Sequence, residues 1–216
     1  RSQTVTGVQT CALPIYREES IKNASYVITQ FRVGQMDARR EDEYLGKRHG
    51  LIGQETTGIG GMAKALRTIP VAIDIAKDMQ NLAPNALLVN FANPSGLVTE
   101  ALFRAVPSVN AVGVCNASIS TKMEILQVLN EQMGTHFNPE DAHIKTLGLN
   151  HLTWYYGFEI NGQDFWPQIM QGIIDQEKSE DDPYFDPETL SILQMLPNSY
   201  LRYFYYTDKM LEKQEH

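Results

Sequence analysis

Residues 87–115 read LLVNFANPSGLVTEALFRAVPSVNAVGVC and contain two short apolar runs on either side of a helical stretch. The runs Leu87–Ala92 and Ala111–Cys115 have the length and residue content of buried strands. Between them, Pro94 suits the first turn of a helix, and Ser95–Ala105 continues it. A strand, a helix and a second strand at this spacing predict a parallel pair of strands joined by a crossover helix.

The same alternation extends on both sides of this segment. Further strand-like and helical stretches are Tyr26–Phe31, Asp37–His49, Ala63–Gln80 and Ser120–Glu131. Pro70 interrupts the third of these, where we expect a kink or a new first turn of helix. The segment 50–61, GLIGQETTGIGG, is too rich in glycine to form a regular element, so we expect a loop there.

These patterns indicate the α/β fold class. We expect a doubly wound, mostly parallel sheet of the Rossmann-like, lactate/malate dehydrogenase-like kind, with helices on both faces. After Asp141 the pattern changes to longer antiparallel strands within His143–Ile160, followed by a hairpin signal at Asn161–Gly162. We therefore expect a partial NAD-binding domain over residues 16–141 and part of a mixed α+β substrate domain over residues 142–216.

Two later segments are expected to play no chemical role. Gln176–Pro187 is acidic and rich in turn-forming residues, so we expect it to be exposed. Tyr200–Tyr206 reads YLRYFYY, and such an aromatic cluster is expected to pack rather than to bind a ligand.

The bulk composition excludes several function classes. The 216 residues carry a net charge of −8, which provides no basic surface for nucleic acid. No apolar run approaches the roughly 20 residues that span a bilayer, and the start of the chain lacks the pattern of a signal peptide. We expect a cytoplasmic protein that binds neither nucleic acid nor membrane.

The N-terminal segment does not follow the rest of the chain. Val5–Ile15 reads VTGVQTCALPI, which is identical to an in-frame translation of a widely used sequencing adapter. We therefore assign residues 1–15 to an adapter or assembly scar, with a genuine disordered leader as the alternative. On this interpretation Cys11 is not native, and Cys115 is the one thiol of the protein.

Polar side chains that follow the predicted strands are the first candidates for chemistry, because ligands of open α/β sheets bind at the carboxyl ends of the strands. Arg32 and Arg39 can present guanidinium groups to phosphate or sugar oxygens, or form a surface ion pair. Glu55 is an isolated carboxylate in the glycine-rich segment, either functional or simply solvated. Asn93 precedes Pro94 and is at least a helix N-cap, with a ligand contact as the other option.

A possible metal site involves Cys115 and His151. Thiolate and imidazole groups are both good ligands for borderline divalent ions. By themselves, a cysteine and a histidine this far apart in the sequence favour a buried core cysteine and a hydrogen-bonded histidine over a metal site.

Several motifs taken together are more specific. The chain contains FRVGQMDAR, GLIGQETTGIGG, LRTIPV, NFANPSGLVTEA, VGVCN and GLNHLTW in this order from Phe31 onward. In order and spacing these segments resemble family 4 of the glycoside hydrolases. The resemblance runs from about Tyr16 to the C-terminus and corresponds to about half of a full-length member of that family.

The resemblance implies roles for individual residues. Cys115 and His151 match the ligands of a manganese-type divalent ion, and Glu55 matches a carboxylate that raises the basicity of a catalytic tyrosine. Arg39, Asn93 and Asn116 match positions that contact substrate. Members that act on 6-phospho-α-glucosides have Cys-Asp at the metal-binding cysteine, whereas 6-phospho-β-glucosidases have Cys-Asn, as in this chain.

The implied reaction differs from glycoside hydrolysis by two carboxylates. In such enzymes NAD takes a hydride from sugar C3, a tyrosine removes the acidified C2 proton, and the metal polarises the sugar oxygens. The aglycone then leaves from C1, water adds and the hydride returns. The tyrosine of relatives lies in a Gly-Gly-x-Tyr-Tyr segment beyond the YLRYFYY run, so no tyrosine of this chain is assigned as the base and no residue as an NAD contact.

Other functions remain open. They are a 6-phospho-α-glucosidase or α-galactosidase of the same family, an NAD-dependent 2-hydroxy acid dehydrogenase, and a non-catalytic fragment that binds metal or sugar phosphate. The 216 residues contain neither the Gly-rich phosphate turn of a nucleotide domain nor the tyrosine segment, so we expect this chain alone to be inactive. Release of p-nitrophenol from its 6-phospho-β-glucoside with NAD and Mn²⁺ would contradict that expectation. The expected partner is a phosphorylated sugar, and the full-length form is expected to be a homo-oligomer.

Overall fold

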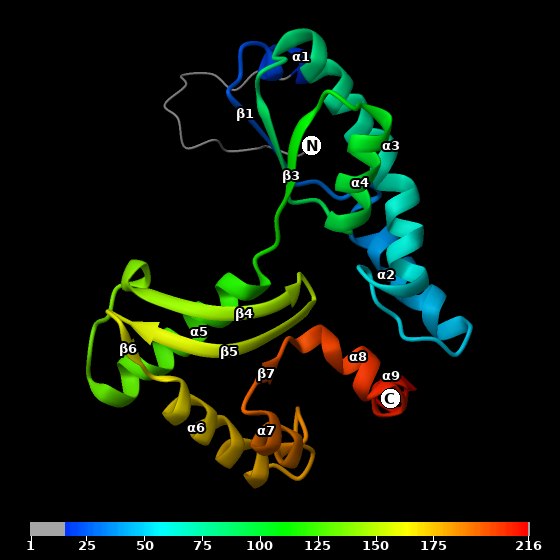
Figure 1. Ribbon diagram of the computed structural model, residues 1–216. Coiled ribbons are helices and arrows are strands. Elements are labelled where there is room, and N and C mark those ends of the chain that lie inside the picture. The colour runs from blue at the N-terminus through cyan, green and yellow to red at the C-terminus, as the bar shows by residue number, and fades with distance from the viewer. Residues whose placement is uncertain (1–15, 216) are drawn as a thin grey trace. The chain divides into compact units, whose positions relative to one another are not determined.

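The structure, a computed structural model, describes residues 16–215 and divides them into two compact units (Figure 1). The first unit comprises residues 16–115 and 211–215, and the second comprises residues 116–210. The segment 1–15 that we assign to an adapter, with Cys11, lies outside the described residues. Among residues 16–215, no helix combines the length and the apolar character that crossing a bilayer requires.

Short parallel strands form the sheet of the first unit. Its elements in chain order are α1 (Arg17–Ile21), β1 (Tyr26–Thr29), α2 (Gln35–Arg48), α3 (Gly58–Leu82), β2 (Leu87–Asn90), α4 (Ser95–Ala105) and β3 (Asn110–Gly113). The strands pair in the order β1-β2-β3, and Leu87 lies between Tyr26 and Asn110 in the register. Parallel strands with helical connections confirm the α/β fold class expected from the sequence.

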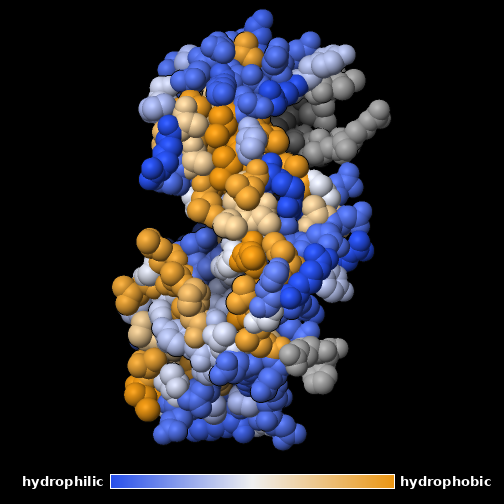
Figure 2. Space-filling view, turned by 90° about the vertical axis from the view of Figure 1, so that its right-hand side faces the viewer, coloured by the Kyte–Doolittle hydropathy of each residue, from blue (hydrophilic) through white to orange (hydrophobic). Residues whose placement is uncertain are grey.

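Helices α3 and α4 cover one face of this sheet (Figure 1). The buried core residues of the two helices are Ala72, Ala76, Met79, Val98 and Leu102. On the opposite face Tyr26, Ile28 and Val112 are 68%, 52% and 41% exposed. We expected helices on both faces, but successive right-handed crossovers along the order β1-β2-β3 bring both helices to the same side. Apolar residues also reach the surface of this unit on the side of its helices (Figure 2).

Helix α3 differs from its predicted form at both Pro70 and its start. It is a single helix of 25 residues with Pro70 inside it, so no second helix begins there. Pro70 is exposed, which allows water to satisfy the carbonyl group that loses its N–H partner. Residues 58–61, expected in a loop, form the first turn of the helix. A Cβ atom at Gly60 would collide with the carbonyl oxygens of Gln54 and Asp42, so glycine here permits close packing rather than flexibility.

The turn after β2 is organised by Asn90 rather than by Asn93. The side chain of Asn90 is fully buried. Its Oδ1 accepts hydrogen bonds from the hydroxyl of Thr29 at 2.9 Å and from the backbone N–H of Ala92 at 3.1 Å, while its Nδ2 donates to Thr99 Oγ1 at 3.2 Å. The N-cap of α4 is Pro94, and the peptide bond between Asn93 and Pro94 is cis. The sequence-based assignment of Asn93 as N-cap was therefore wrong.

Asn90→Ala is expected to destabilise the first unit by about 2 kcal/mol, because it leaves the buried hydroxyl of Thr29 and the N–H of Ala92 without a partner. The matched control is Asn110→Ala at an exposed position of β3, with an expected change below about 0.5 kcal/mol. Urea unfolding followed by far-UV circular dichroism measures both variants. Equal stabilities would show that the Asn90 hydrogen bonds contribute nothing net.

The second unit is built on an antiparallel sheet. Its elements are α5 (Ala117–Met133), η1 (Pro139–Asp141), β4 (Ala142–Leu149), β5 (Leu152–Ile160), β6 (Gln163–Asp164), α6 (Trp166–Ser179), α7 (Pro187–Leu193), β7 (Leu196–Pro197), η2 (Ser199–Leu201), α8 (Arg202–Tyr205) and the first four residues of α9 (Thr207–Glu215). Asn161 and Gly162 have φ values of 51° and 79°, which confirms the hairpin predicted there. A second hairpin, not predicted, joins β4 to β5 through Asn150 and His151, since Leu149 pairs with Leu152.

The two units divide between Cys115 and Asn116, earlier than the boundary at Asp141 expected from the sequence. The physical reason is the packing of α5, whose residues Ile125, Leu126 and Leu129 belong to the same buried cluster as the β5 aromatic residues. A helix that looks like the last crossover of the parallel sheet therefore contributes its apolar face to the antiparallel one.

The later segments agree with expectation in part. The acidic stretch begins inside α6, which continues to Ser179, and only the residues after it are irregular. The aromatic run packs as expected: Tyr205 lies edge-on to Trp154 at a ring-centroid distance of 5.9 Å.

The end of helix α9 belongs to the first unit. The backbone N–H of Gly53 donates to Gln214 Oε1 at 2.9 Å, and Lys47 Nζ donates to the carbonyl of Gln214 at 2.8 Å. Residues at the far end of the described chain thus complete the hydrogen bonding of a loop near its beginning.

Candidate active site

The carboxyl edge of the parallel sheet carries three of the candidate residues. Arg32 follows β1, Asn93 follows β2 and Cys115 follows β3. Because the three strands are adjacent and parallel, these residues leave the sheet at the same edge. Cys115 is half-buried and belongs to the first unit, whereas Asn116, the N-cap residue of α5, belongs to the second.

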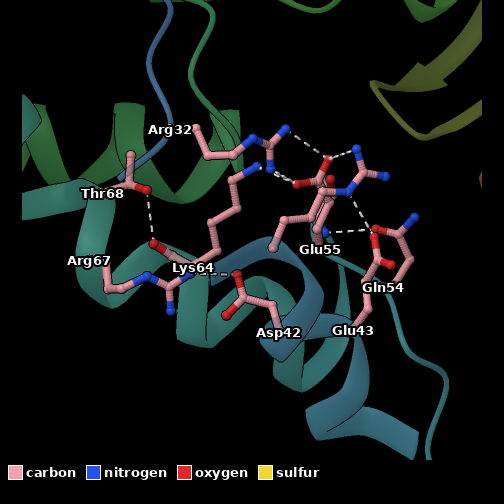
Figure 3. Close-up of polar contacts among 10 residues, drawn as sticks. Arg32, Asp42, Glu43, Gln54, Glu55, Lys64, Arg67 and Thr68 are labelled. Carbon is pink, nitrogen blue, oxygen red and sulfur yellow. Dashed lines mark hydrogen bonds and ion pairs between the residues drawn. The ribbon is translucent and has the colours of Figure 1, made fainter. Parts of the chain in front are cut away.

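A cluster of charged side chains lies beside this edge (Figure 3). Glu55, from the loop before α3, accepts hydrogen bonds from Arg32 and, at 2.9 Å, from Lys64 Nζ. Arg39 on α2 approaches the same carboxylate, with 3.8 Å between its Nη1 and Oε1 of Glu55, and donates to Glu43 at 2.9 Å. The structure therefore brings together Arg39 and Glu55, both predicted, and adds Lys64, which the sequence analysis missed. We call Arg32, Arg39, Glu55 and Lys64 the ion cluster.

The ion cluster contains more positive than negative charge in a poorly solvated place. The side chains of Glu55 and Lys64 are only 13% and 5% exposed. Burial opposes ionisation of Glu55, but hydrogen bonds from Arg32 and Lys64 and the charges of both outweigh it and lower its pKa from 4.5 to about 2. Burial disfavours the charged form of Lys64 and lowers its pKa. The hydrogen bond and the charge of Glu55 raise this pKa, but Arg32 and Arg39 repel the ammonium group, so the net shift is downward.

Two chemical consequences follow from this arrangement. Three cations face the two carboxylates of Glu55 and Glu43, so one positive charge is in excess, and an additional anion would find guanidinium donors from Arg32 and Arg39, whose side chains are 30% and 39% exposed. Glu55, with its pKa near 2, stays ionised and is a poor proton acceptor at neutral pH. Its predicted effect on a catalytic tyrosine stays a prediction, and its contacts here are to cations.

A second ion pair supports the cluster from the neighbouring turns of the same helices. Arg67 of α3 donates to Asp42 of α2 at 2.5 Å, and Asp42 is 3% exposed (Figure 3). Thr68 on the next position of α3 donates its hydroxyl to the carbonyl of Lys64 at 2.8 Å. The pair of Arg67 and Asp42 joins α2 to α3, and so supports the backbone from which Arg39 and Lys64 extend.

His151 lies in the second unit, in the turn between β4 and β5. Burial lowers the pKa of its imidazole, so the ring is neutral near pH 7 and suited to metal coordination. An imidazole nitrogen and the thiol of the half-buried Cys115 are each a type of ligand that suits a borderline divalent ion. Within residues 16–215, no group of three or more His, Cys, Asp or Glu side chains comes together as a ready-made metal site.

The ring of His151 is covered by Tyr200, which sequence analysis also missed. The two ring centroids are 3.6 Å apart and the ring planes differ by 2°. The only sequence signal for this contact was the aromatic run itself, expected to pack. For Lys64, the sequence signal was its position as a lone lysine within the apolar stretch GMAKAL, from which no role was predicted.

Comparison with known families gives two matches. A model described as "Family 4 glycosyl hydrolase" matches residues 7–131, which is more than half of the chain and begins within the segment 1–15. A model described as "Family 4 glycosyl hydrolase C-terminal domain" matches residues 146–216.

Individual relatives fall into two substrate classes. The chain is 40% identical to the 6-phospho-beta-glucosidase of Escherichia coli over 201 residues, which covers 90% of this chain and 44% of that protein. It is 31% identical over 215 residues to 6-phospho-alpha-glucosidase 1 of Lacticaseibacillus paracasei, covering 90% of this chain and 46% of the relative. The chain thus spans about half the length of the curated relatives it matches.

Among solved structures, the 6-phospho-beta glucosidase of Thermotoga maritima, determined with manganese, NAD⁺ and glucose-6-phosphate, has a TM-score of 0.80 to this chain. The two are 31% identical, and the match covers 94% of this chain and 48% of that one. The similarity includes both units, since coverage of this chain is nearly complete.

Proposed function

Because the chain belongs to family 4 of the glycosyl hydrolases, we propose that the protein takes part in hydrolysing 6-phospho-β-glucosides to glucose 6-phosphate and an aglycone, with NAD and a divalent metal as cofactors. The observation that carries this proposal is the ion cluster at the carboxyl edge of the parallel sheet. It supplies a partly buried excess of positive charge, which a sugar phosphate requires and which a neutral glycoside does not.

Two observations support the β over the α substrate class. Asn116 follows Cys115, as in family members that act on 6-phospho-β-glucosides. The relatives of 38% and 40% identity are named 6-phospho-β-glucosidases, whereas three relatives named phospho-α-glucosidases are 28–31% identical.

The residues of the chain divide into three tasks in this proposal. Arg39, together with Arg32, holds anionic or hydroxyl oxygens of the sugar phosphate, and Glu55 fixes the two guanidinium groups in place. Asn93 and Asn116 contribute amide groups that hydrogen-bond sugar hydroxyls. Cys115 and His151 hold the metal, and a manganese ion bound there would polarise sugar oxygens.

The proposal is tested without turnover by comparing two thioglycosides, p-nitrophenyl 6-phospho-1-thio-β-glucoside and its α anomer, in calorimetric titrations of the whole chain with Mn²⁺ and NAD present. We expect the β anomer to bind about tenfold more tightly, a difference of about 1.4 kcal/mol. Tighter binding of the α anomer would reassign the substrate class, and no binding of either would refute the proposal.

The variant Arg39→Ala checks that the binding uses the ion cluster. It is expected to weaken binding of the β anomer by at least about tenfold through loss of a charge-assisted hydrogen bond. Arg40→Ala, one residue further on the same helix with a side chain 62% exposed, is the matched control and is expected to leave the affinity unchanged. Equal losses in both variants would point to general charge attraction instead.

A further inference from the structure

His151 is unusually well buried for a residue in a hairpin turn. It follows Asn150 in the two-residue connection between β4 and β5, and Asn150 is exposed with a φ of 45°. Side chains in such turns normally face solvent. His151 is nevertheless only 8% exposed to solvent, and Tyr200 covers one face of its ring. The turn is also closed by a hydrogen bond from the hydroxyl of Thr153 to the carbonyl of Asn150.

Tyr200 is itself held in place by a buried amide. Asn198 is 3% exposed, and its Oδ1 accepts the backbone N–H of Tyr200 at 3.0 Å. Its backbone N–H donates to the carbonyl of Thr153 at 2.8 Å, and its Nδ2 donates to the hydroxyl of Tyr155 at 3.2 Å. Asn198 thus ties the segment carrying Tyr200 to the same strand that begins next to His151.

We propose that Tyr200 is a positioning residue for the imidazole of His151, and that it fixes the ring plane in which the histidine coordinates its metal ion. This inference rests on the metal-binding role given to His151 in the proposed function. Tyr200 acts through His151 in this account and touches neither metal nor substrate.

The geometry of a stacked pair suits this role. A metal ion binds an imidazole nitrogen in the plane of the ring, at its edge, whereas Tyr200 occupies the face. At a centroid distance of 3.6 Å and an angle of 2°, the imidazole cannot turn about its Cβ–Cγ bond without colliding with the phenol ring. The entropy of fixing that torsion is therefore lost on folding and not on metal binding, which strengthens binding.

Tyr200 is backed by a further ring. Tyr203 lies edge-on to it at a centroid distance of 5.8 Å and an angle of 75°. Tyr200 therefore has a second aromatic contact besides His151, as expected for a group that is held in place to orient another.

The test is a calorimetric titration of the whole chain with MnCl₂ alone, using Tyr200→Leu, which keeps apolar bulk but removes the flat ring. Metal affinity is expected to fall about tenfold, the lower end of the range found when residues supporting a metal ligand are changed. Tyr200→Phe keeps the ring and is expected to restore affinity to within about twofold of the wild type. Tyr205→Leu, at an exposed position of the same aromatic run, is the matched control and should leave affinity unchanged.

A second readout follows the stack directly and needs no metal. In the metal-free protein, the Hε1 proton resonance of His151 should be shifted upfield by the Tyr200 ring, with the shift retained in Tyr200→Phe and lost in Tyr200→Leu. Wild-type affinity in Tyr200→Leu would overturn the positioning role and leave the proposed function standing. Absence of Mn²⁺ binding by the wild-type chain, or undiminished binding by His151→Ala, would instead refute the metal site and this inference with it.

Discussion

Replacing Glu55 by glutamine is expected to destabilise the first unit by about 3 kcal/mol, because the buried ammonium group of Lys64 then has no negative partner. Lys64 is only 5% exposed and cannot recover hydration, whereas Arg32, with 30% of its side chain exposed, can turn toward water. The loss is measured by urea unfolding followed by far-UV circular dichroism. Trp154 and Trp166 both lie in the second unit, so tryptophan fluorescence follows the unfolding of that unit. This unfolding curve serves as an internal control and should be the same in the variant and the wild type.

A second substitution separates the charge effect from lost packing. Adding Lys64→Met to Glu55→Gln removes the unpaired buried cation and is expected to restore about 1–2 kcal/mol. If the double variant is no more stable than Glu55→Gln alone, the destabilisation does not come from the unpaired charge of Lys64.

The same carboxylate governs part of the acid stability. The pKa of Glu55 in the folded chain is about 2, below its ordinary value of 4.5, so its ionised form stabilises the fold above pH 4.5 and this contribution is lost as the pH falls from 4.5 toward 2. In Glu55→Gln, the decline in unfolding free energy over that window is therefore expected to be shallower than in the wild type.

Gly60→Ala is expected to destabilise the first unit by about 3 kcal/mol, at the upper end of the range for overpacked positions. The new Cβ would meet the carbonyl oxygens of Gln54 and Asp42, the second at 2.7 Å, and backbone atoms cannot move aside as a side chain can. Helices α2 and α3 would have to separate, which would also disturb the pair of Asp42 and Arg67.

Gly96→Ala in helix α4 is the matched control. A Cβ atom there meets nothing within 4 Å, so the variant is expected to stabilise the unit by roughly 0.5–1 kcal/mol through higher helix propensity. Thermal and urea unfolding of both variants give the comparison. Similar changes for the two glycines would mean that α2 and α3 yield easily at Gly60.

Elements set by local signals were predictable from the sequence. The helix Ser95–Ala105 was predicted with both of its ends, because a proline at its start and a regular apolar repeat lie within the segment itself. The Asn161–Gly162 hairpin is also local, since these two residues adopt positive φ at little cost. The motifs that indicated the family are likewise contiguous stretches, which is why the family could be recognised before any geometry was known.

Features that depend on distant contacts were not predictable. Glycines 60 and 61 looked like loop residues because nothing in the segment reveals that a neighbouring backbone will lie against them. The assignment of α5 to the second unit depends on which sheet receives its apolar face, and its sequence is compatible with either. Asn93 was favoured as the cap because of its position before a proline, whereas it is the side chain of buried Asn90 that hydrogen-bonds the backbone of this turn, at the N–H and the carbonyl of Ala92.

The hydrogen bonds of Gln214 can form only late in the synthesis of the protein. Gly53, whose N–H donates to the side chain of Gln214, leaves the ribosome 161 residues before its partner. At roughly 5–20 residues per second, translation separates the two by roughly 10–30 s. Throughout that interval the loop before α3 has no partner from α9, even after β3 has been translated and the parallel strands and the ion cluster can form. The nascent first unit must therefore persist in an incomplete form while the whole second unit is being translated.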